Sequence, residues 1–196
     1  MSPTFAIDLG SKLAGTTVVV QGDLEMNSPL SFHASAKKQD ADAMIVSLLT
    51  PPPAATVYLD APLSLPGVYR QLDGFDDFHL RRGDRELAAM SPMFLGGLTA
   101  RAMRLAANHP HCVWHEVYPA AQAKRIELPK DQYKKSTDAL PAMAEELASK
   151  IQSPFDPEAV TSWHHFDALL AWLTAERHAL GQATSHGHPA EGVIIV

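Results

Sequence analysis

The chain has 196 residues, of which 46% are hydrophobic and 19% are charged, and its formal net charge at pH 7 is −6. This is an ordinary globular composition, so we predict one domain over residues 1–196 with a modest insertion. The acidic balance argues against a protein that coats nucleic acid non-specifically, because such binding depends on many Lys and Arg contacts to phosphate. The single cysteine, Cys112, excludes an internal disulfide and a cysteine-rich zinc site.

No stretch of the sequence approaches the ~20 apolar residues that a bilayer-spanning helix needs. Residues 1–4 carry no positively charged side chain of the kind that opens a secretory signal. We therefore expect a cytoplasmic protein without a membrane partner. The sequence leaves its oligomeric state open.

Three short apolar segments near the start of the chain predict antiparallel strands. They alternate apolar and polar residues or are rich in β-branched residues, and Gly22 and Asp23 form a turn signal after the second segment. Their close spacing favours a meander, in which each strand pairs with the next. The segments are residues 5–7, 16–20 and 30–34.

A helix and a fourth strand are predicted next. Asp40 has the short polar side chain of an N-cap, residues 43–49 suit a helix, and the prolines at 51–53 are expected to end it. Residues 56–59 form a short apolar strand that stops at Asp60. A strand, a helix and a strand in this order favour a parallel crossover.

The second half of the chain has a less regular pattern. Residues 62–110 are interpreted as an insertion that lies over the edge of the sheet, with helical stretches near 84–90 and 97–107. Residues 186–188 belong to a polar stretch that we expect to be flexible. The remaining predicted elements are a fifth strand at 112–115, helices at about 137–150 and 157–180, and a final strand or extended tail at 191–196.

Three of the predicted strands stop at a carboxylate, namely Asp8, Asp60 or Glu116. In open α/β sheets, ligands bind outside the carboxyl ends of parallel strands, so these acids are expected at one edge. Each acid alone could be a turn or cap residue. Their shared placement favours a common site.

A fourth acid, Asp167, borders the apolar stripe of the last long helix, where it would be costly to bury without a cation or a hydrogen-bond donor. Like charges brought close together repel one another unless a cation lies between them. Mg²⁺, or Mn²⁺, prefers hard oxygen ligands and keeps open positions for water and phosphate. We therefore predict that Asp8, Asp60, Glu116 and Asp167 are both metal ligands and catalytic residues.

These acids stand in short motifs that follow one another in a fixed order. In that order and pattern the chain resembles the DUF429 family, a group of predicted nucleases with a ribonuclease H-like fold, over nearly its whole length. The motifs are Ile7-Asp8-Leu9-Gly10, Leu59-Asp60-Ala61-Pro62, Arg82-Gly83-Asp84-Arg85, Glu116-Val117-Tyr118-Pro119 and Phe166-Asp167-Ala168-Leu169.

The resemblance implies an α/β fold with a five-stranded mixed sheet, in which three antiparallel strands precede the parallel crossovers and helices flank the sheet. It places Asp8 on the central first strand, Asp60 at the end of the fourth and Asp167 on a late helix, at the positions of metal-binding acids. It also implies a nuclease that acts on a nucleic acid or nucleotide. Fold alone does not fix function, so this activity remains an expectation.

A nuclease of this kind would use two Mg²⁺ ions about 4 Å apart to hydrolyse a phosphodiester bond. Asp8 would bridge the ions, and Glu116 would be a further ligand or would orient water. Arginine and lysine side chains that could bind substrate phosphates are concentrated in two segments, one in the insertion and one after the fifth strand. Their alternative role is a solvated, salt-bridged surface. The predicted substrate-binding residues are Arg82, Arg85 and Lys134, with Tyr118 stacking on a base.

Other functions stay open. Residues 8–11 followed by Gly15 are similar to the phosphate loop of the actin-like ATPases and sugar kinases, although those proteins carry two such domains. A non-catalytic module that binds nucleic acid or protein is the second alternative. A zinc site is not expected from the adjacent pair His164 and His165, because their side chains point about 100° apart on a helix.

Overall fold

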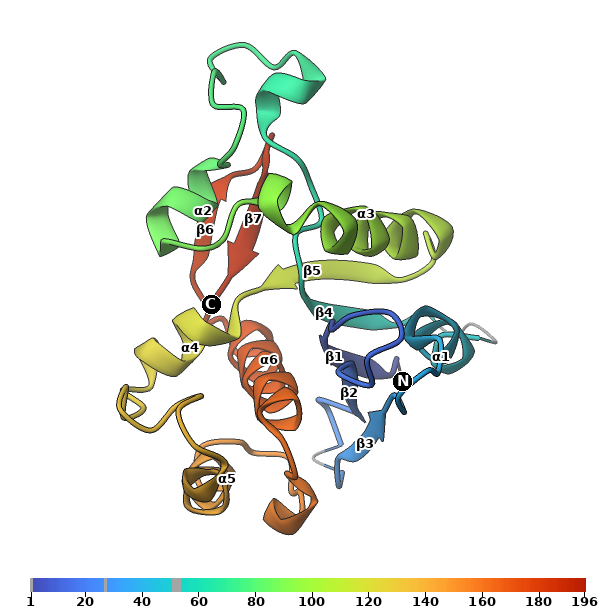
Figure 1. The fold of residues 1–196 in the computed structure, drawn as a ribbon, viewed down its shortest axis with the longest axis vertical. Coiled ribbons are helices and arrows are strands. Elements are labelled where there is room, and N and C mark those ends of the chain that lie inside the picture. The colour runs from blue at the N-terminus through green and yellow to red at the C-terminus, as the bar shows by residue number, and fades with distance from the viewer. Residues whose placement is uncertain (1, 27, 51–53) are drawn as a thin grey trace.

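A mixed sheet of seven strands forms the centre of the chain, in the order β3-β2-β1-β4-β5-β7-β6 (Figure 1). The computed structural model describes residues 2–26, 28–50 and 54–196. The strands are β1 (Thr4–Asp8), β2 (Val18–Gly22), β3 (Ser31–Ala34), β4 (Thr56–Asp60), β5 (Val113–Val117), β6 (Ser185–His188) and β7 (Gly192–Ile195).

The strand pairing has an antiparallel half and a parallel half. The first strand pairs antiparallel with β2, which pairs antiparallel with β3, as the meander prediction requires. On its other side β1 pairs parallel with β4, and β4 pairs parallel with β5. The predicted meander and the parallel crossover are therefore both confirmed.

The expected number of strands was too small, because β7 and β6 extend the sheet beyond β5. The strand β7 pairs parallel with β5, and β6 pairs antiparallel with β7. The sequence of β6 is Ser-His-Gly-His, which has no apolar alternation, so we expected a flexible polar stretch there. Its strand conformation comes from backbone pairing with β7 and from α2 (Arg82–Leu87), which packs on it.

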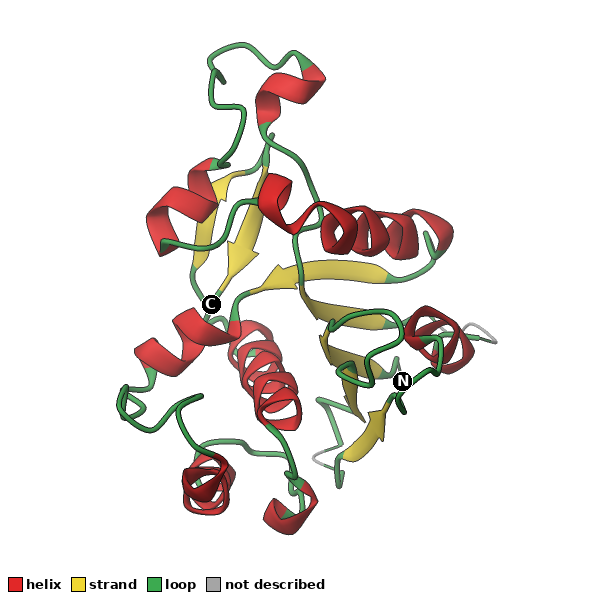
Figure 2. Ribbon diagram, in the orientation of Figure 1, coloured by secondary structure: helices red, strands yellow, loops and turns green. Residues whose placement is uncertain are grey.

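Helices cover both faces of the sheet (Figures 1 and 2). One apolar core joins Ile7 and Leu59 to residues of α1 and α3 on one face. The second core joins Ala6 and Tyr58 to α6 and its neighbours on the other face. Residues alternate between the faces because successive side chains in a strand point to opposite sides. The helices are α1 (Ala41–Leu48), α3 (Pro92–Asn108), α4 (Pro119–Arg125), α5 (Leu140–Ala148) and α6 (Trp163–Ala179).

Local signals explain where the helices begin and end. The Asp40 side chain accepts hydrogen bonds from the backbone N–H groups of Asp42 and Ala43, so it caps α1 as predicted. This helix ends at Leu48, and the prolines at 51–53 lie outside the described residues. The helix α4, which the sequence analysis did not predict, begins with Pro119 at its first position.

The segment predicted as an insertion, residues 62–110, contains the 3₁₀ turn Gly67–Arg70, α2 and α3. The helix α2 packs against β6 and β7 at one edge of the sheet, and α3 lies over the face that α1 also covers. Within the described part of the chain, no helix combines the length and apolar character needed to cross a bilayer.

Candidate metal centre

Two of the predicted acids lie side by side at the end of the parallel strands. Asp8 ends β1 and Asp60 ends β4, and the register of these strands places the two residues directly opposite each other. Ala6 and Tyr58, two positions earlier in each strand, contact the core beneath α6. Strand alternation therefore turns both carboxylates toward the face that α6 covers.

The helix α6 supplies the third acid. Ser162 caps this helix by accepting the His165 N–H, and the following turns bury their apolar side chains against β1 and β2. Asp167 lies in the first part of the helix and is 2% exposed. Asp8, Asp60 and Asp167 each offer a carboxylate oxygen such that these oxygens lie within 4.8 Å of one another. We call this group the acidic triad.

The triad concentrates negative charge in a poorly hydrated place. Burial raises the pKa of Asp60 well above its ordinary value, and the nearby charges of Asp8 and Asp167 raise it further. Burial also raises the pKa of Asp167, although Lys134 acts in the opposite direction. A divalent cation would remove this cost, and three hard oxygen donors are the ligands that Mg²⁺ and Mn²⁺ prefer. The donor set therefore fits such an ion.

Three side chains contact the triad from outside it. The His164 ring nitrogen Nδ1 lies 2.7 Å from the Asp8 Oδ2 oxygen, and this contact raises the pKa of the imidazole. The Tyr133 hydroxyl donates to Asp167 Oδ1 at 2.6 Å, and the Lys134 ammonium group forms an ion pair with Asp167 Oδ2. Both Asp167 oxygens thus have a partner supplied by one loop.

The sequence analysis missed the contacts of His164 and Tyr133. His164 was weighed only as a zinc ligand together with His165, and the side chains of these two residues do diverge, since His165 contacts Ser162 instead. The usable signal was the spacing of His164 and Asp167, because residues three apart on a helix share a face. Tyr133 had no comparable signal in the sequence.

Glu116 does not join the acidic triad. The register pairs Glu116 with Leu59, one residue before Asp60, so Glu116 lies on the opposite face from the triad. Its carboxylate accepts hydrogen bonds from both terminal nitrogens of Arg81, at 2.5 and 2.7 Å, and from the Leu63 N–H. Glu116 therefore lines the same cavity as Asp8 and Asp60, but its carboxylate is held by Arg81 and stays outside the triad.

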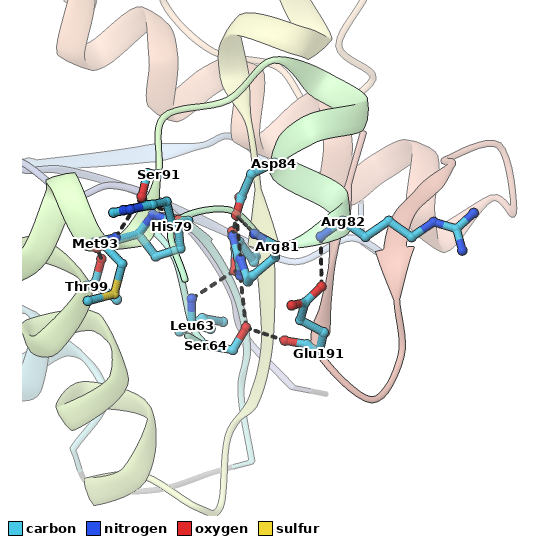
Figure 3. Close-up of polar contacts among 12 residues, drawn as sticks. Leu63, Ser64, His79, Arg81, Arg82, Asp84, Ser91, Met93, Thr99 and Glu191 are labelled. Carbon is cyan, nitrogen blue, oxygen red and sulfur yellow. Dashed lines mark hydrogen bonds and ion pairs between the residues drawn. The ribbon is translucent and has the colours of Figure 1, made fainter. Parts of the chain in front are cut away.

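Arg81 is the centre of a buried ion-pair cluster (Figure 3). It is 1% exposed, and its five N–H groups donate to Asp84, Glu116 and Ser64. A buried guanidinium is tolerated only when it is fully paired, and this condition is met here. The cluster fixes the start of α2 to β5.

Glu191 attaches the same segment to the last strand. Its carboxylate accepts the backbone N–H group of Arg82 at 2.7 Å, and its carbonyl accepts the Ser64 hydroxyl (Figure 3). The other carboxylate oxygen accepts the Gly67 N–H, also at 2.7 Å. The next residue, Gly192, has a φ of +107°, and a Cβ there would lie 2.4 Å from Ser64 Oγ. Glycine is therefore required at this close approach.

The predicted substrate-binding residues fall into two groups. Tyr118 and Lys134 line the same cavity as Asp8 and Asp60. Arg82 and Arg85 instead line a separate depression with Asp77 and Glu191, where Arg82 pairs with Glu86 and Arg85 pairs with Asp77. These two arginines therefore match the alternative role, that of a solvated surface held by salt bridges.

The loop after β1, which resembles a phosphate loop, has partners of its own. The Gly10 N–H donates to the Thr17 hydroxyl at 3.1 Å, and the Ser11 N–H donates to the Thr16 hydroxyl at 3.0 Å. The Gly10 carbonyl accepts a hydrogen bond from Arg101. Two backbone donors that would face a phosphate are therefore already used within the protein.

No protein-family model matches the chain, and no curated protein matches it significantly. The resemblance to the DUF429 family therefore stays a prediction, and the acidic triad is the feature of the structure that points to a function.

Proposed function

We propose that the protein is a Mg²⁺- or Mn²⁺-dependent phosphoryl-transfer enzyme, and specifically a nuclease that hydrolyses phosphodiester bonds. The observation that carries this proposal is the acidic triad, with its carboxylate oxygens within 4.8 Å of one another. The strand order β3-β2-β1-β4-β5 supports it, because three antiparallel strands followed by two parallel ones are the arrangement of a ribonuclease H-like core.

In this proposal Asp8, Asp60 and Asp167 would hold the divalent ions. The chemistry that bound ions would supply is activation of water and stabilisation of the leaving oxygen in an in-line displacement. His164 holds the Asp8 carboxylate in place through its 2.7 Å contact. Lys134, which pairs with Asp167, lies where it can turn toward a substrate phosphate once a cation has replaced it.

The proposal is tested by titrating Mg²⁺ and Mn²⁺ into the metal-free protein and measuring the heat of binding. We expect wild type to bind the ion, and Asp8→Asn to bind at least tenfold more weakly because it loses a charged oxygen ligand. Asp76→Asn is the matched control, since Asp76 is exposed and lies outside the triad. Equal metal binding by wild type and Asp8→Asn would refute the site.

Activity is then measured on single-stranded, duplex and branched nucleic acids with Mg²⁺ and Mn²⁺. Cleavage should depend on the metal and should be lost in Asp8→Asn, but not in Asp76→Asn. Normal nucleic-acid binding by Asp8→Asn without any metal dependence would instead favour the non-catalytic binding module. Thermal stabilisation by ATP but not by oligonucleotides would favour the actin-like alternative, although the engaged N–H groups of Gly10 and Ser11 count against it.

A further inference from the structure

The cavity that Asp8 and Asp60 line has both charged and apolar side chains in its wall. Its volume is about 350 Å³, which falls within the ~300–1,000 Å³ of small-molecule sites. The charged lining is Asp8, Asp60 and Lys134, together with Asp84 and Glu116, which are both paired with Arg81. The large apolar side chains of the lining, which we call the apolar wall, are Leu9, Met90, Leu95, Leu98 and Ile194.

The apolar wall is not needed to bind a metal ion. A hydrated divalent cation requires oxygen donors and water, and an apolar surface offers it neither. Met90 is 60% exposed and Leu95 is half-buried, so these two side chains are open to a ligand, whereas Leu9, Leu98 and Ile194 are held by packing within the protein. A break in α3 at Gly96, where φ is +20° and ψ is −82°, separates Leu95 from Leu98. The wall is therefore a feature that a ligand larger than the ion can use.

From this division we infer that the cavity receives one unpaired nucleotide of the substrate, with its phosphate at the triad and its base against the apolar wall. This inference rests on the proposed function, because the phosphate is placed by the metal site. The charges agree with it, since Lys134 and a cation held by the triad would attract the phosphate, and the apolar wall would contact a face of the uncharged base. Tyr118 lines the same cavity and offers an aromatic face.

A base inside an intact duplex does not fit this arrangement. Its faces are covered by the neighbouring base pairs and its edge is paired, so it reaches side chains in a cavity only after leaving the stack, at a cost in unstacking energy. A single strand or a free nucleotide can enter the cavity without this loss of base pairing and stacking. The cavity therefore selects an unpaired nucleotide, supplied either by a strand or as a free molecule.

The test uses a single-stranded oligonucleotide labelled with a fluorophore, its duplex form, and a nucleoside monophosphate as competitor. Binding is measured by fluorescence anisotropy in Ca²⁺, on wild type, Met90→Asn and Phe94→Asn. Phe94 is the matched control because it is 81% exposed, stacks on His79 and does not line the cavity. Both changes are uncharged, so neither alters the attraction for phosphate.

We expect wild type to bind the single strand at least tenfold more tightly than the duplex. Met90→Asn should weaken single-strand binding about fivefold or more, because it loses an apolar contact to the base. Phe94→Asn should change this binding less than twofold, because Phe94 does not line the cavity. Competition by the monophosphate at concentrations similar to those of the oligonucleotide would assign the site to free nucleotides. Competition only by the oligonucleotide would assign it to strands.

Equal binding of single strand and duplex, equal effects of the two variants, or no binding of either probe would overturn the inference. Calorimetry of Mn²⁺ on the same proteins separates this failure from that of the proposed function. If the metal binds and Asp8→Asn abolishes it, only the unpaired-nucleotide inference fails. If no metal binds, the proposed function fails first.

Discussion

Lys134 is the residue that most directly links the metal-free protein to its proposed activity. Burial lowers the pKa of this lysine, but the charges of Asp167, Asp60 and Asp8 raise it more, so the ammonium group stays charged beside the triad. It therefore supplies part of the positive charge that a divalent ion would bring. A metal ion that binds the triad must compete with Lys134 for Asp167.

We predict that Lys134→Met increases the affinity for Mn²⁺ about two- to fivefold, because removing a half-exposed ion pair worth ~0.5–1 kcal/mol frees an oxygen of Asp167. The same change should weaken binding of the single-stranded oligonucleotide. Lys135→Met, at the neighbouring exposed position, is the control and should leave both affinities unchanged. Calorimetry with Mn²⁺ makes the measurement, and weaker metal binding by Lys134→Met would contradict the competition.

The sequence predicts the positions of some acids of the site and not of others. Asp8 and Asp60 could be found because each ends an apolar run, and both runs became parallel neighbours in equal register. Glu116 ends an equally clear run, yet a shift of one residue turned it to the other face. Register depends on pairing between distant segments, which no local pattern of residues contains.

Among the elements, β4, β5 and α6 meet at a second group of titratable residues, away from the triad. The Tyr58 hydroxyl lies 2.9 Å from His178 Nδ1, and the rings of His115 and His178 are 4.8 Å apart. Burial, and then the neighbouring His178, lowers the pKa of His115 to about 4. The folded protein therefore holds this imidazole in its neutral form.

This depressed pKa makes stability depend on pH. The unfolded chain protonates His115 near pH 6.5, whereas the folded protein protonates it only near pH 4. The neutral imidazole therefore does not oppose folding above pH 6.5, and the free energy of unfolding decreases as the pH falls from 6.5 to 4. From pH 7 to 5 we expect the Tm of wild type to drop about 2–4 °C more than that of His115→Gln. Thermal unfolding at both pH values checks this, with His111→Gln as an exposed control. Parallel pH profiles for wild type and His115→Gln would contradict it.

The elements that were predicted correctly carry their own local signals, and those that were missed do not. The cap at Asp40, the β-branched run of β2 and the long apolar stripe of α6 are readable from the sequence. The strand β6 has no such signal, because a Ser-His-Gly-His segment becomes a strand only when β7 and α2 provide partners. Its position depends on tertiary contacts rather than on propensity.

For the whole molecule, the triad lowers the stability of the metal-free protein, and a bound metal ion would reverse this effect. The raised pKa of Asp60 means that its protonated form favours folding at acid pH, and that this contribution is lost as the pH rises through the folded-state value. At pH 7 without metal, Asp60 therefore opposes folding, through its charge or through the cost of protonating it. On the proposed function, added Mg²⁺ should raise the Tm of wild type, because an ion held by the triad would bind only the folded protein.

We predict that Asp60→Asn raises the Tm in EDTA at pH 7 by about 2–6 °C, since it removes a half-buried carboxyl group that opposes folding beside Asp8 and Asp167. The variant should gain almost nothing from Mg²⁺, so that the order of stability reverses when the ion is added. Differential scanning calorimetry with EDTA and with Mg²⁺ makes the comparison. A variant with a lower Tm than wild type in EDTA, or with the same increase in Tm on adding Mg²⁺, would show that the triad does not destabilise the metal-free protein.

The hairpin of β6 and β7 has a consequence for any attempt to reduce the protein to its five central strands. Ile194 of β7 belongs to the apolar wall, and Glu191 holds the backbone at Gly67 and at Arg82. Removing the hairpin would leave all three carboxylates of the triad in the chain. It would also remove Ile194 from the lining of the cavity and free the backbone at Gly67 and Arg82. A shortened protein would thus keep the proposed metal ligands but lose part of the surface that we propose selects the nucleotide.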